Sequence, residues 1–177
     1  MVQDTIMAAP RKLVISGAAG ISWFAAIPGL PSHLETRVHR LGPSFSGRVM
    51  WHPGYLLRAG IESGHTHLYS YDLEAAGTSG SVRLDGVPLL VQFAMPVGER
   101  VEVYAGYGTY RLTSTLDFLG RVRTSFFSQG YSAALAYRIP LQDRWGMVME
   151  LKWMNAFVTG HHVLALQWRM DLDAWRW

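Results

Sequence analysis

Residues 162–172 read HVLALQWRMDL, and an apolar side chain recurs at every second position of this segment. One parity carries Leu164, Leu166, Trp168, Met170 and Leu172, and the other includes Gln167, Arg169 and Asp171. Because successive side chains of a β-strand point to opposite faces, this alternation predicts a strand with one apolar face and one polar face.

Seven other segments show the same alternation, and turn residues such as Pro53 and Gly54 separate them. They are residues 12–26, 44–52, 55–69, 81–94, 101–112, 125–139 and 146–157. Eight alternating segments predict an all-β fold, namely a single antiparallel up-and-down transmembrane β-barrel of about eight strands. We expect residues 1–11 to form an N-terminal tail and residues 12–177 to form the barrel domain.

The composition agrees with a barrel in a membrane. Hydrophobic residues make up 49% of the 177 residues and charged residues 16%, whereas a soluble domain carries about 25% charged residues. No window approaches the ~18 consecutive apolar residues of a transmembrane helix, so helical membrane proteins are excluded. The chain has no cysteine, which excludes disulfides and thiolate metal sites. A net charge of +3 is too small an excess to predict nucleic-acid binding.

The connections between the predicted strands alternate in length. The longer ones are residues 27–43, 70–80, 113–124 and 158–161, and the short turns are 52–54, 95–100 and 140–145. Outer-membrane barrels have short turns on the periplasmic side and longer loops outside. We therefore expect a location in the bacterial outer membrane. Both termini would be periplasmic, because the number of strands is even.

Aromatic residues gather near the ends of the predicted strands, where membrane proteins carry interfacial aromatic belts. The expected aromatic girdle consists of Trp23, Trp51, Tyr55, Tyr69, Tyr137 and Trp145. The alternative is that these positions only reflect the general preference of aromatic side chains for strands.

The first ten residues, MVQDTIMAAP, lack the basic segment and the apolar stretch of a secretory signal. An outer-membrane protein must be exported. We therefore expect this chain to be a mature form, an expressed form with an added Met, or the product of a start site placed too late in the gene. The missing signal also leaves open a soluble ligand-binding β-barrel, in which the apolar parity would face inward.

The eight alternating strands, the short turns opposite longer loops and the terminal aromatic Trp177 together resemble the small OmpA/OmpX-type outer-membrane barrels. The resemblance is one of architecture and covers residues 12–177. It implies an envelope protein of a Gram-negative bacterium that is inserted by the barrel-assembly machinery and needs no cofactor.

In that class the last strand ends on an aromatic residue that is preceded by apolar residues at alternate positions. Counting back from Trp177 instead reaches two aspartates. Either a β-bulge near residues 171–174 restores the phase, or the strand ends near Leu172 and residues 173–177 form a tail.

The polar parity of the strands collects charged residues of both signs. These are Arg48, Arg58, Glu62, Glu102, Arg138, Glu150, Lys152, Arg169 and Asp171. The interior of an eight-stranded barrel is just wide enough for side chains to fill it, and buried charges require partners. We therefore expect a structural network of ion pairs inside the barrel. A conducting pore lined by the same residues is the alternative.

The longer connections carry basic and apolar residues that would lie at the outer surface. The basic ones, which predict a rim in contact with lipopolysaccharide phosphates, are Arg37, His39, Arg40, Arg121, Arg123, His161 and His162. The apolar ones, which would face a protein partner if there is one, are Phe118, Leu119, Phe126 and Phe127. A solvated rim without a specific ligand is the alternative to both. The first hypothesis is thus a structural or surface-interaction barrel.

Residues 60–70 hold Glu62, Ser63, His65 and His67, the side chains that an acyl hydrolase or transferase acting on lipid A would use. The lipid A deacylases pair His and Ser two residues apart and follow them with Asn, a run that this sequence lacks. Glu62 and His65 also fall on opposite faces of an ideal strand. We therefore expect no enzyme and no metal site, although His65 and His67 share a face, and keep the lipid A acyl hydrolase as the second hypothesis.

Overall fold

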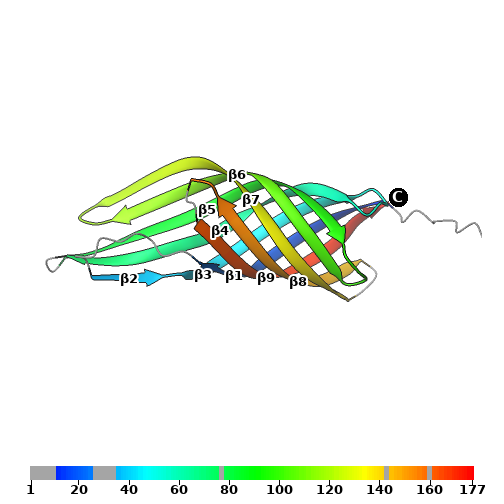
Figure 1. Cartoon of the computed structure of the whole chain (residues 1–177), viewed down its shortest axis with the longest axis horizontal. Helices are drawn as coiled ribbons and strands as arrows, with labels where there is room; N and C mark the ends of the chain where they lie inside the picture. The colour runs from blue at the N-terminus through cyan, green and yellow to red at the C-terminus, as the bar shows by residue number, and fades with distance from the viewer. Residues whose placement is uncertain (1–10, 26–34, 76–77, 142–143, 159–160) are drawn as a thin grey trace, which may run out of the picture.

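The computed structural model describes residues 11–25, 35–75, 78–141, 144–158 and 161–177, apart from the side chains of residues 35–37, 73–75, 78 and 161. β-Strands run through most of these residues (Figure 1). The strands are β1 (Lys12–Phe24), β2 (Glu35–His39), β3 (Leu41–His52), β4 (Arg58–Ala75), β5 (Thr78–Pro96), β6 (Val101–Asp117), β7 (Arg121–Pro140), β8 (Trp145–Ala156) and β9 (His161–Arg176). The described residues include no helix long and apolar enough to cross a membrane.

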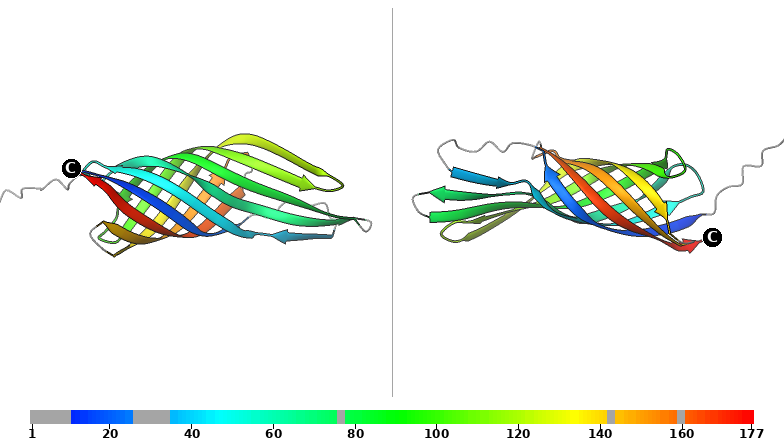
Figure 2. Two further views of the ribbon diagram at one scale, coloured as in Figure 1. Left: turned by 180° about the vertical axis from the view of Figure 1, so that it is seen from behind. Right: turned by 90° about the horizontal axis from the view of Figure 1, so that it is seen from below.

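The strands close into a ring of antiparallel neighbours (Figure 2). From β4 to β9 each strand pairs with the next, β9 pairs with β1, and β3 lies between β1 and β4. β2 continues the line of β3 along β4, because β3 pairs with residues 59–66 of β4 and β2 with residues 70–74. The nine strand segments thus occupy eight positions in the wall, and the predicted all-β barrel is confirmed.

The strands are staggered around the ring. The stagger is measured by following register partners once around the ring, from Phe24 of β1 through β9, β8 and the remaining strands to β3. The path returns to β1 at Val14, so the stagger is ten residues. Such a stagger requires strands tilted by about 40–45° to the barrel axis. The eleven steps between the twelve residues of β8, at ~3.3 Å each, then give a closed wall about 27 Å high.

The two faces of the wall are inverted relative to a soluble protein. Leu89 on the outer face is 61% exposed and Ile61 56%, whereas Glu150 and Lys152 inside are 0% and 1% exposed. The outer face therefore presents apolar side chains and the interior holds the charged ones, as in a transmembrane barrel. A soluble ligand-binding barrel requires the opposite arrangement, so that alternative is wrong.

The barrel has two different ends. The ends of the described wall at Lys12 and Arg176 and the connections β3–β4, β5–β6 and β7–β8 lie at one of them, which we call the turn end. At the other, β4, β5, β6 and β7 project beyond β1, β8 and β9, and we call it the extended end (Figures 1 and 2).

Three of the predicted long connections are wrong over much of their length, because the strands at the extended end run through them. Residues 35–39 and 41–43 are strand, β4 and β5 continue to Ala75 and from Thr78, and β6 and β7 leave only residues 118–120 as a turn. The β-branched residues 113, 115, 122 and 124 favour strand there. Gly120 and Leu119 close the turn with φ angles of 156° and 54°.

The last strand contains a β-bulge. Val14 faces Asp173 and Leu13 faces Trp175, so Ala174 is the extra residue. This insertion restores the parity and places Trp175 on the outer face, where it is exposed. The bulge alternative is therefore confirmed, and the expectation of a free tail after Leu172 is wrong.

Candidate functional site

The charged residues of the interior meet in the middle of the barrel. Arg48 of β3 donates from Nε to Glu62 Oε2 at 2.7 Å and from Nη2 to Glu150 Oε1 at 2.9 Å. Lys152 Nζ lies 2.5 Å from Glu62 Oε1 and 3.2 Å from Glu150 Oε1. Two cations and two carboxylates from three different strands thus alternate in one buried cluster.

Arg169 extends this cluster toward the turn end. Its guanidinium binds Glu150 and donates from Nε to Asp171 at 2.8 Å, and Asp171 also accepts from Arg138 at 3.0 Å. The hydroxyl of Tyr104 accepts from Arg169 at 2.9 Å, and Arg169 also stacks on the Tyr104 ring, with its Cζ 4.9 Å from the ring centroid.

Tyr104 connects the ion pair of Arg58 and Glu102 to the rest of the charge network. Its hydroxyl donates to Glu102 at 2.5 Å, and Glu102 is paired with Arg58. All nine charged residues expected inside therefore form one connected network. The sequence analysis did not include Tyr104, although it lies on the same parity as Glu102, because an aromatic residue there was not taken as a polar partner.

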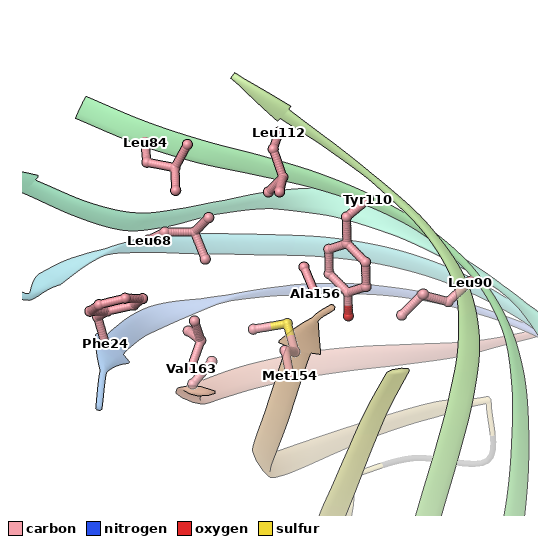
Figure 3. Close-up of a cluster of buried hydrophobic side chains, with 10 residues drawn as sticks. Phe24, Leu68, Leu84, Leu90, Tyr110, Leu112, Met154, Ala156 and Val163 are labelled. Carbon is pink, nitrogen blue, oxygen red and sulfur yellow. The ribbon is translucent and has the colours of Figure 1, made fainter. Parts of the chain in front are cut away.

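An apolar cluster fills the interior between this network and the extended end. Figure 3 shows its side chains converging from several strands. They are Phe24, Leu68, Leu84, Leu90, Tyr110, Leu112, Met154, Ala156, Val163 and Ala165. Leu112 is 0% exposed and Phe24 1%. Hydrogen bonds continue from Lys152 through Gln167 and Ser44 to Thr66 along one side of this apolar plug. The plug fills the interior beside them.

The outer face carries a cleft of about 220 Å³ where the apolar wall ends. On β5 the outward side chains are apolar from Met95 to Val87, and the next two toward the extended end are Asp85 and Arg83. The cleft is lined by His65, Arg83, Asp85, Val87, Thr113, Thr115, Arg121 and Arg123. Four strands line this cleft, and two of them, β5 and β7, bring three arginines and one aspartate together. We call it the outer-wall cleft.

Asp85 is held by its neighbours within this cleft. Arg83 donates from Nε to Asp85 Oδ2 at 2.7 Å, and the Nδ1 of His67 lies 3.0 Å from Oδ1. Burial alone would raise the pKa of Asp85, but the hydrogen bonds from Arg83 and His67 outweigh it and hold this pKa below its ordinary value of 3.8. The carboxylate is therefore occupied as a partner of Arg83.

Arg121 and Arg123 are the free cations of the outer-wall cleft. Register pairs place Arg123 opposite Thr115, and Thr115 opposite Arg83. The side chains of Arg121 and Arg123, both in β7, are exposed, and neither makes an ion pair with any residue that the structure describes. The sequence analysis found these two arginines but missed Arg83, because only the register across β5, β6 and β7 brings it next to them.

Of the other residues of the expected basic rim, His39, Arg40 and His162 do not share this cleft. His39 is exposed and lies 3.2 Å from Asp72, and Arg40 is half-buried beside β1. His162 accepts from Trp153 Nε1 at 3.2 Å. The side chains of Arg37 and His161 lie outside the described part of the chain. The basic residues expected to form one rim therefore lie in several separate environments.

The four apolar residues expected to face a partner lie in different environments. Phe118 packs over Gly80 on β5, where an added Cβ would lie 2.6 Å from the ring, and Leu119 is exposed at the tip of the turn. Phe127 points outward and is exposed. Phe126 is half-buried against the apolar plug, so its assignment to an outer surface is wrong.

Five of the six girdle residues lie exposed on the outer surface, at the two ends of the wall: Trp23, Trp51, Tyr55, Tyr137 and Trp145. Tyr69 is different. A β-bulge between His67 and Tyr69 reverses the parity, so Tyr69 packs against Phe24 inside, with 4.8 Å between the ring centroids. Its assignment to the girdle is wrong.

A second group of aromatic side chains at the extended end was missed. Trp153 meets Tyr131 edge to face, with 5.2 Å between the ring centroids, and Phe157 lies 5.6 Å from Tyr131 and 6.4 Å from Tyr107. Tyr107, Tyr131 and Trp153 fall on the outward parity of β6, β7 and β8, and this alternation in the sequence could have indicated the group.

The residues considered for an acyl hydrolase do not assemble. Glu62 points inside and belongs to the charge network, whereas His65 and His67 lie beside Asp85. Ser63 donates its hydroxyl hydrogen to the backbone oxygen of Pro88 at 2.9 Å rather than to a histidine. Among the described residues, no three His, Asp or Glu side chains are arranged to hold a metal ion.

Comparison with known proteins gives a match at the level of the fold alone. No family model matches the sequence, and no curated protein matches it. Among solved structures, the N-terminal β-barrel domain of Pseudomonas aeruginosa OprF is 10% identical, with 93% of this chain and 100% of that one covered and a TM-score of 0.50. Neisserial surface protein A is 12% identical (91% and 96% covered, TM-score 0.47).

The attachment invasion locus protein Ail of Yersinia pestis, solved with the heparin analogue sucrose octasulfate, is 10% identical, with 93% and 97% covered and a TM-score of 0.46. The barrel domain of OprF, with its TM-score of 0.50, confirms the resemblance to the small OmpA/OmpX-type barrels for the fold. The low identity carries no residue role from one chain to the other.

Proposed function

We propose that this protein is an integral outer-membrane barrel whose outer-wall cleft binds the phosphate groups of lipopolysaccharide. The inverted faces support the membrane location, because apolar side chains such as Leu89 and Ile61 cover the outside. The closed wall, about 27 Å high, agrees with the roughly 25 Å apolar band of outer-membrane barrels.

The orientation follows from the two different ends. Outer-membrane barrels have short turns in the periplasm and long strands and loops outside. The turn end, which carries Lys12 and Arg176, would therefore face the periplasm, together with the N-terminal tail of residues 1–11. The extended end would face the exterior. The outward Trp175 of β9 lies at the turn end, where an interfacial aromatic side chain agrees with this orientation.

The single observation that carries the ligand proposal is the position of the outer-wall cleft. It begins where the apolar side chains of β5 end at Val87, so in this orientation it lies at the level of the outer lipid head groups. Lipid A carries its phosphates at that level. Arg121 and Arg123 have no acidic partner among the described residues, and guanidinium groups bind phosphate with two parallel hydrogen bonds.

The test removes the two free cations and keeps the fold. The variant carries Arg121→Gln and Arg123→Gln, and the matched control carries Arg11→Gln and Arg100→Gln, which removes two exposed arginines from the opposite end. Lipid A and dephosphorylated lipid A are offered to the detergent-solubilised barrels, and retained lipid is measured by native mass spectrometry.

Because a hydrogen bond to a charged group is worth about 1.5–3 kcal/mol, we expect the variant to retain lipid A at least about tenfold less well than the wild type and the control. Equal retention of lipid A and dephosphorylated lipid A by the wild-type barrel would contradict the proposal. An equal loss in the control would contradict it as well, because the effect would then be one of total charge.

A further inference from the structure

A second cleft, of about 170 Å³, lies at the turn end, among β1, β7, β8 and β9. It is lined by Lys12, Arg138, Pro140, Arg144, Trp145, Gly146, Asp171, Asp173 and Arg176. Four of these side chains are cations and two are carboxylates. This cleft, which we call the turn-end cleft, belongs neither to the outer-wall cleft nor to the buried centre of the charge network.

The two carboxylates of the turn-end cleft are already occupied. Asp173 accepts from Lys12 Nζ at 3.1 Å and from Arg176 Nη2 at 2.6 Å. Asp171 accepts from Arg169 at 2.8 Å and from Arg138 Nη2 at 3.0 Å. Neither aspartate is therefore free to take up the remaining positive charge of the cleft.

Two guanidinium groups of the turn-end cleft have donors without an acceptor among the residues that the structure describes. The Nε of Arg138 is buried and has no hydrogen-bond partner among the described residues, so its hydrogen-bonding capacity is incomplete. A buried donor without an acceptor costs about 1–3 kcal/mol, which an incoming anion would recover. Arg144 is exposed and pairs with no described carboxylate. The cleft thus offers two guanidinium groups to one ligand.

Gly146 provides the space for that ligand. It lies on the inward parity of β8, where Val148 and Glu150 fill the interior with their side chains. A Cβ built on Gly146 would lie 3.8 Å from Arg138 Nε, with ordinary van der Waals clearance. A larger side chain is therefore compatible with the backbone and would occupy the cleft, which makes this position suitable for a test.

We infer that the turn-end cleft binds a single phosphate group between Arg138 and Arg144. A phosphate oxygen near Gly146 would accept from the unpaired Nε of Arg138, and the exposed guanidinium of Arg144 would bind a second oxygen. Trp145 at the edge of the cleft is the kind of residue that marks a membrane interface. The phosphate belongs either to a phospholipid head group of the inner leaflet or to a free phosphate of the periplasm.

The experiment places a carboxylate of the protein in the cleft. Gly146→Asp supplies an anion beside Arg138, and Gly98→Asp is the matched control, because it adds the same charge at the same end with nothing within 4 Å of its Cβ. Arg144→Gln is the second variant. A shift in migration on a denaturing gel between heated and unheated samples verifies that each variant is folded.

Two probes separate the sources of phosphate. Inorganic phosphate is titrated into the barrels in a zwitterionic detergent without phosphate and followed by 31P line broadening, and phosphatidylglycerol retained from nanodiscs is measured by native mass spectrometry. We expect Gly146→Asp and Arg144→Gln each to weaken at least one probe by about tenfold or more and Gly98→Asp to weaken neither.

A loss for phosphatidylglycerol identifies a head-group site, and a loss for inorganic phosphate alone identifies a site for free phosphate. If neither probe binds the wild type, or if Gly98→Asp and Gly146→Asp have equal effects, the inference is overturned. Because no residue of the outer-wall cleft is changed, this result is independent of the test with lipid A.

Discussion

Arg48 and Glu62 face each other as register partners of β3 and β4, fourteen residues apart in the chain, and their side chains form an ion pair inside the barrel wall. Both side chains are almost completely buried, so each depends on the other and on their second partners, Glu150 and Lys152. In the middle of the barrel these ion pairs fill the interior, next to the apolar plug.

Removal of one member of this pair leaves a buried charge without its partner. We predict that Arg48→Met lowers the free energy of unfolding by about 3–5 kcal/mol. The double variant Arg48→Met, Glu62→Met should lose less than the sum of the two single variants, because it removes both charges together. Urea unfolding in detergent micelles, followed by tryptophan fluorescence, measures all four proteins. Strict additivity would show that the pair is not coupled.

The close approach of β1 and β9 at Gly20 leaves no room for a side chain. A Cβ there would lie 1.9 Å from the backbone oxygen of Leu166, whereas a Cβ at Gly17 on the same strand meets nothing within 4 Å. We predict that Gly20→Ala prevents folding or strongly reduces the yield of the heat-modifiable form, and that Gly17→Ala folds like the wild type. Equal yields for both variants would show that the strands are not packed as described.

The apolar plug should prevent ion flow through the barrel. Leu112 and Phe24 lie between the charge network and the extended end, and both side chains are almost completely buried in the interior. We predict that the barrel shows no steady unit conductance in a planar bilayer, and that Leu112→Ala costs about 2–5 kcal/mol of stability. Discrete, long-lived open steps in the wild type would show that the plug does not close the barrel.

The outward position of Trp175 at the end of β9 should be required for assembly. If β9 kept Ala174 but had no bulge, Trp175 would point inward opposite Lys12 instead of outward opposite Leu13. Deletion of Ala174 removes the extra residue and leaves Trp175 outward opposite Leu13, so we predict that this deletion folds like the wild type. Trp175→Asp, which places a charge on the outer face, should reduce the folded fraction after refolding into lipid vesicles. The folded fraction is read from heat-dependent migration on a gel, and a normal yield for Trp175→Asp would refute this role.

The alternation of side chains was sufficient to predict the barrel and the orientation of its faces. In β9, for example, Leu166 and Trp168 point outward and Gln167 and Arg169 inward, because the period of two applies wherever a strand separates an apolar from a polar environment. The bulge near the end of β9 could also be anticipated, since only an inserted residue reconciles the apolar parity with the terminal aromatic residues.

The errors have a common physical cause, because strand parity is local and cannot show a bulge or a partner strand. Tyr69 was assigned to the wrong face because the bulge after His67 reverses the parity within β4. The outer-wall cleft was recognised only in part, since Arg83 reaches Arg123 through the register of three strands. The loops were predicted too long because the ends of β4 to β7 continue as strands beyond the apolar wall.

The central claim is that apolar side chains of this barrel face lipid and charged side chains face its interior. The natural absence of cysteine allows single cysteines to be introduced at each position from 86 to 94 of β5 and spin-labelled in barrels refolded into lipid vesicles. We predict that collisions with dissolved oxygen alternate with a period of two, high at residues 87, 89, 91 and 93 and low between them. Uniform accessibility to a water-soluble relaxation reagent along the strand would contradict the claim.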